Sequence, residues 1–109
     1  MSLDVEALTK SMVAAAGGVL EKKWKTVQPY AEEEFGKLAA TFKFIEAEVL
    51  ALRMSPAKAA IHLEMQKEAA AEVLLTVQGL SQLAIEEAIN AALEVVRDTV
   101  NTALRFPLL

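Results

Sequence analysis

The sequence predicts an all-α fold, an antiparallel four-helix bundle of long helices with short turns, packed into a homo-oligomer. Three observations predict it. The chain is 54% hydrophobic, much of this is alanine, a strong helix former, and there are only four glycines and three prolines to break helices. Apolar residues recur at spacings of three and four, as on one face of a helix. One predicted helix carries apolar residues on two sides, which a single small bundle does not cover.

Composition limits the other possibilities. A chain of 109 residues fits one helical domain, residues 1–109. The net charge of −4 argues against nucleic-acid binding, which needs a basic surface. There is no cysteine for disulfides or thiol chemistry. The longest uncharged run, Val73 to Ile85, is shorter than the ~20 residues that span a bilayer, and no export signal is evident, so the expected location is cytoplasmic.

The first helix is expected over residues 3–27, capped by Ser2 or Asp4. The Gly17–Gly18 pair lies inside it, where it either allows close approach of a neighbouring helix or weakens the helix. The apolar seam of this helix comprises Val5, Leu8, Met12, Ala15 and Val19.

Charge indicates the next boundary. Lysines cluster before Pro29 and glutamates, among them Glu32 and Glu34, follow it, as the helix dipole favours at a C-terminus and an N-terminus respectively. Proline also suits the first turn of a helix. We therefore expect the second helix over residues 29–54. One long helix kinked at Pro29 is the alternative.

The second helix carries two apolar stripes. Its main seam, with the spacing of a helix packed lengthwise on others, comprises Phe35, Leu38, Phe42, Ile45, Val49 and Leu52. A second stripe points well away from this seam, since each residue turns the helix by ~100°. We assign this stripe to an oligomer interface, formed by Ala40, Phe44, Ala47 and Ala51.

Two further helices complete the bundle. Ser55-Pro56 predicts a start for the third helix, residues 56–78, and Gly79 suits a left-handed position after it. Ser81 caps the fourth helix, residues 81–104, and residues 105–109 form an apolar tail docked on a neighbouring helix or on another chain. The inward face of the fourth helix comprises Ile85, Ala88, Ile89, Ala92, Val96, Val100 and Ala103.

Candidate chemistry is sparse. Glu46, His62, Glu64 and Glu68 are the candidate ligands of an iron, manganese or zinc site like those inside carboxylate-rich bundles. However, Ala59 stands where the glutamate of a Glu-x-x-His pair would be needed. We expect instead a solvated glutamate ridge, with the core seam on the opposite side of the third helix, and no cofactor. A lone histidine without a cysteine or a nucleophile motif predicts no enzyme.

The segment from Lys22 to Lys25, which includes Trp24, mixes basic and aromatic residues. This pattern occurs at membrane surfaces, but a helix end covered by Trp24 explains it as well. The leading hypothesis is a non-enzymatic, self-associating helical bundle with a structural or protein-interaction role. The alternatives are a carboxylate/histidine metal-binding bundle and a protein that binds apolar ligands or membrane surfaces.

Overall fold

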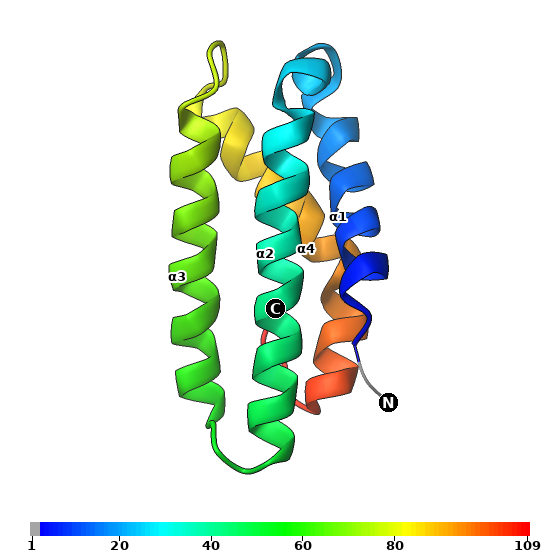
Figure 1. Ribbon diagram of the computed structural model, residues 1–109, viewed down its shortest axis with the longest axis vertical. Coiled ribbons are helices and arrows are strands. Elements are labelled where there is room, and N and C mark those ends of the chain that lie inside the picture. Colours follow the sequence, from blue (N-terminus) through cyan, green and yellow to red (C-terminus); the bar gives the residue numbers. More distant parts are fainter. Residues whose placement is uncertain (1–2) are drawn as a thin grey trace.

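A computed structural model describes residues 3–109 as an all-α fold with antiparallel packing, as the sequence predicts. The molecule measures 43 × 22 × 18 Å, and its helices run along the long axis, with α4 inclined behind the others (Figure 1). In chain order the elements are α1 (Val5–Leu20), the 3-10 turn η1 (Glu21–Lys23), α2 (Trp24–Leu50), α3 (Pro56–Leu75) and α4 (Gln82–Leu104).

The predicted boundary at Pro29 is wrong. Helical residues run without interruption from Val5 through η1 to Leu50, so this half of the chain is one continuous helical run that folds back on itself, and not two helices divided at Pro29 as expected. The chain reverses at η1, where Glu21 takes a φ of 43° and its N–H donates to the Gly17 carbonyl. Pro29 lies inside α2.

Gly17 allows close packing at this reversal. A Cβ on Gly17 would lie 3.0 Å from Cε2 of Trp24, so the missing side chain lets the indole ring pack directly on α1. Trp24 is partly buried against the core, as the structural interpretation of the lysine–tryptophan segment expects. A Cβ on Gly18 would meet nothing within 4 Å, so close approach is a property of Gly17 alone.

The side chains predicted to cap the N-termini of α1, α3 and α4 do so. Asp4 caps α1 through Ala7 N–H, Ser55 caps α3 through Lys58 N–H and Ser81 caps α4 through Ala84 N–H. Ser2, the other candidate cap, lies outside the described residues.

The stop signals are less accurate. Helix α2 ends at Leu50, and Leu52, predicted in its seam, lies in the following loop with a φ of 61° and 93% exposure. Helix α3 ends at Leu75 rather than at residue 78. Gly79 does adopt a left-handed φ of 89°, but in a turn closed by Leu80 N–H and the Val77 carbonyl, not directly after the helix.

One continuous core runs along the inner faces of the helices. Most of the α2 seam and of the α4 face is buried as predicted, and Leu93 and Leu104 add to the α4 contribution. In α1 the seam drifts to Ala16 and Leu20, while Val19 is exposed. The largest fully buried side chains are Phe35, Phe42, Met12, Leu38, Ile45, Leu74, Ile85, Leu104, Val27 and Val100.

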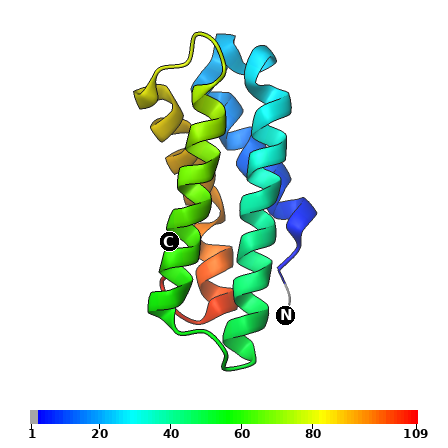
Figure 2. The same cartoon turned by 60° about the vertical axis from the view of Figure 1, so that its left-hand side comes forward.

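The helices do not pack equally. Helix α1 packs on both α2 and α4, whereas α3 packs mainly on α2 and touches α4 much less. Figure 2 shows α2 and α3 side by side, with α4 behind them. The seam between α3 and α4 is therefore open along part of its length.

The C-terminal tail, residues 105–109, docks on its own chain. The Asn101 side chain holds it: Oδ1 accepts from the N–H groups of Leu108 and Leu109, each at 3.0 Å, and Nδ2 donates to the Leu109 carbonyl at 3.3 Å. Phe106, Leu108 and Leu109 are partly buried against the core. Within residues 3–109, no helix has the length and apolar character needed to cross a membrane.

Candidate functional site

One exposed surface, called here the apolar face, lies across α2 and α3. It is a shallow depression of about 440 Å³. Its lining residues are Ala40, Thr41, Phe44, His62, Met65, Gln66 and Ala69. Phe44 is 50% exposed and Met65 is 63% exposed. The rings of Phe44 and His62 lie 5.8 Å apart at 60°, so the aromatic residue of α2 contacts the histidine of α3.

The chemistry of the apolar face is that of a contact surface. Among residues 3–109, no Asp, Glu, Lys or Arg lines it. Depletion of charge around exposed aromatic and methionine side chains is typical of the centre of a protein interface. Ala47 and Ala51 are also exposed; Ala47 extends the stripe along α2, and Ala51 follows directly after the end of this helix. The predicted interface residues Ala40, Phe44, Ala47 and Ala51 are thus uncovered on a single copy of the chain.

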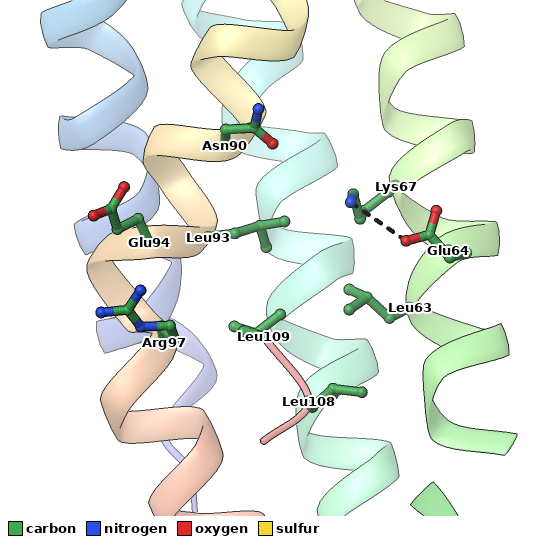
Figure 3. Close-up of a pocket in the computed structure, with 9 residues that line it drawn as sticks. All are labelled: Leu63, Glu64, Lys67, Asn90, Leu93, Glu94, Arg97, Leu108 and Leu109. Carbon is green, nitrogen blue, oxygen red and sulfur yellow. Dashed lines mark hydrogen bonds and ion pairs between the residues drawn. The ribbon is translucent and has the colours of Figure 1, made fainter. Parts of the chain in front are cut away.

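A second surface, called here the acidic groove, lies between α3 and α4. Two adjoining hollows of about 340 and 310 Å³ make it up, and both are lined by Glu64, Lys67 and Asn90. Figure 3 shows the hollow beside the tail, with Leu93 of α4 on one side, Leu63 of α3 on the other, and Leu108 and Leu109 next to them. The remaining lining residues are Glu94, Arg97, Leu108 and Leu109 in one hollow and Glu68, Ala71, Glu86 and Ile89 in the other.

The charges on the acidic groove are mostly carboxylates. Glu64, Glu68, Glu86 and Glu94 line it, against two cations. Lys67 forms a 3.4 Å ion pair with Glu64, so one of these cations is already paired within α3. The glutamate ridge of α3 is exposed, and Leu63, Ala70 and Leu74 on the other side are buried, as predicted.

The candidate metal ligands do not come together. Glu46 is buried and accepts the Leu3 N–H at 2.9 and 3.2 Å through its two oxygens, while Lys43 donates to the Leu3 carbonyl at 3.0 Å. His62 lies on the apolar face, and Glu64 and Glu68 line the acidic groove. Among residues 3–109, no group of three or more His, Asp or Glu side chains could hold a metal ion.

Sequence reasoning missed one buried carboxylate, Glu34. Its expected role at a helix N-terminus is wrong, because α2 begins at Trp24 and places Glu34 well inside the helix. Lys37 donates to it at 3.1 Å. This hydrogen bond and the charge of Glu34 raise the pKa of Lys37. In the sequence, this pairing of Glu34 with Lys37 is indicated only by their i, i+3 spacing.

Comparison with known proteins adds no relationship: no family model, curated protein or solved structure matches the chain.

Proposed function

We propose that the protein is a non-enzymatic helical interaction domain that associates with a second copy of itself through the apolar face. The observation that carries the proposal is the gathering of exposed Phe44 and Met65 in one depression that two helices share and that is lined by no acidic, lysine or arginine side chain among residues 3–109. Burying apolar area contributes ~25 cal/mol per Å², so covering these side chains favours association.

The form of the face supports a second copy as the partner. A two-fold dimer packs the same patch against itself, which requires a self-complementary surface. Here the small residues Ala40 and Ala69 border the larger Phe44 and Met65. Small residues on one copy let the large side chains of the other approach closely. A face without acidic, lysine or arginine side chains among its described lining residues also meets its own copy without repulsion between such charges.

The alternatives among surfaces are weaker. The apolar tail is already docked on its own chain through Asn101, so it needs no second copy. Val95 is 53% exposed on α4 but lies outside both described surfaces. Single exposed apolar residues of this kind are normal in monomeric proteins.

Light scattering on the purified protein and two charge variants tests the proposal. Phe44→Glu places a charge in the apolar face, and Val95→Glu, at a residue of nearly equal exposure, is the matched control. We expect a dimer for wild type and Val95→Glu, and a monomer for Phe44→Glu. A wild-type monomer at high micromolar concentration would contradict the proposal, as would a Phe44→Glu dimer.

Cysteine cross-linking gives an independent test, because the chain has no natural cysteine. Ala47→Cys introduces a thiol beside the apolar face, and Val95→Cys places one elsewhere. We expect oxidation to yield a covalent dimer much faster for Ala47→Cys than for Val95→Cys. Equal rates would indicate random collision rather than association through this face.

A further inference from the structure

The acidic groove lies where α3 and α4 make few helix-to-helix contacts. Helix α3 packs mainly on α2 and α4 mainly on α1, and two hollows lie along the seam between α3 and α4. The tail fills only the end of the seam near Leu63 and Leu93. At the other end, near Ala71 and Ile89, no residue of the tail lines the groove. A groove between two helices is a common site for a third helix from a partner.

The tail indicates what the groove accepts. Leu108 and Leu109 place apolar side chains between α3 and α4, as Figure 3 shows. Their backbone is anchored by Asn101. The groove floor therefore receives leucine side chains in the folded protein itself. Ala71 and Ile89 continue the apolar floor in the second hollow. Leu108 and Leu109 line only the first hollow.

The rim indicates the charge of the partner. Near the open end the carboxylates of Glu68 and Glu86 come from opposite helices, and the cation there, Lys67, is paired with Glu64. An apolar segment with lysine or arginine along its edges would complement such a rim, whereas an acidic segment would be repelled.

From this combination we propose that the acidic groove is a docking site for a basic amphipathic helix of a partner protein. Leucine-like residues of that helix lie on Ala71 and Ile89, and its cations face Glu68 and Glu86. The part of α4 that the tail leaves open, from Glu86 to Asn90, is about 6 Å long at 1.5 Å per residue, which fits roughly one turn of a bound helix. The proposal does not depend on association through the apolar face, which is a different surface.

A peptide titration followed by ¹⁵N–¹H NMR tests the proposal. The probe is a leucine–lysine amphipathic peptide of about 14 residues, since shorter helices are marginal in water. A peptide with glutamate in place of every lysine is its counterpart. We expect the basic peptide to shift the amide signals of residues around Ala71 and Ile89, and the acidic peptide to shift none. Shifts centred on Phe44 and Met65 would overturn the proposal.

Two neighbouring glutamates provide matched variants. Glu86 lines the acidic groove, whereas Glu87 is exposed and does not line it, so Glu86→Lys and Glu87→Lys change the net charge equally. Both positions are exposed, and circular dichroism checks that both variants remain helical. We expect Glu86→Lys to weaken binding of the basic peptide by roughly fivefold or more, and Glu87→Lys by less than about twofold. Equal weakening would show unspecific attraction to an acidic protein and overturn the proposal.

Discussion

The two sides of α2 carry the same residue type in opposite settings. Phe42 on the inner side is 0% exposed, at the centre of the core, and Phe44 on the outer side is 50% exposed. Ala39 and Ala40 repeat the contrast, one buried and one exposed. Hydrophobicity alone therefore does not tell what a residue contributes. The inner residues stabilise the fold of one chain, and the outer residues are available for contact with another.

Truncating the two phenylalanines gives the largest expected difference. We expect Phe42→Ala to lower the free energy of unfolding by about 3–5 kcal/mol, because it leaves a cavity in the core. Phe44→Ala in a monomeric sample should cost less than about 1 kcal/mol. Urea denaturation at high dilution measures both. Similar losses would mean that the outer side of α2 is part of the structural core.

Enlarging the two alanines tests the same contrast from the opposite direction. Ala39 is fully buried, so Ala39→Leu overpacks the core, and we expect a loss of about 1–3 kcal/mol. Ala40→Leu adds its methyl groups at the surface and should stay within about 0.5 kcal/mol of wild type. The measurement is again urea denaturation. A large cost at Ala40 would contradict its placement outside the packed interior.

The glycine pair extends the comparison to α1. Gly18→Ala should stabilise the protein by about 0.5–1 kcal/mol, because alanine favours helix and a Cβ there meets open space. Gly17→Ala should gain clearly less, since its Cβ would lie 3.0 Å from the Trp24 ring. Thermal melts of the two variants check this order. Equal gains would show that the ring moves aside without cost.

The smallest expected effect concerns an exposed ion pair at the end of α2. Arg53 donates to Glu48 at 2.9 and 3.0 Å, and this hydrogen bonding lowers the pKa of Glu48. The pair therefore stabilises the fold above the unfolded pKa of Glu48, and this contribution is lost as the pH falls through the lower folded value. Glu48→Gln should melt slightly below wild type at neutral pH. The difference should vanish in acid, and a constant difference would contradict the assignment.

Sequence patterns predicted the fold class and the inward faces because helical periodicity and capping are local signals. Ser55 and Ser81 cap their helices as expected, and the α2 seam is buried from Phe35 to Ile45. The reversal at Glu21 was missed, because the close packing at this point is a tertiary contact. The Trp24 ring packs on the bare backbone of Gly17, and charge patterns near Pro29 carry no information about that contact.

The candidate surfaces were predictable only in part. The second stripe of α2 identified Phe44 and its alanines, but their neighbours Met65 and Ala69 come from α3, and the pairing of the two helices is not visible in the sequence. Of the acidic groove, the sequence predicted only the exposed glutamates of α3, Glu64 and Glu68, and not the groove itself. It exists because α3 and α4 diverge and the tail turns back onto Asn101, and both depend on how the helices pack.

Intermolecular NOE measurements test the role of the apolar face most directly. A sample that mixes ¹³C-labelled and unlabelled copies reports only contacts between different chains. We expect cross-peaks between the Phe44 ring of one copy and the methyl groups of Met65 and Ala69 of another. If a concentrated sample gives no such cross-peaks, or gives them only at residues of the α4 surface such as Val95, the contrast between the two sides of α2 does not extend to function.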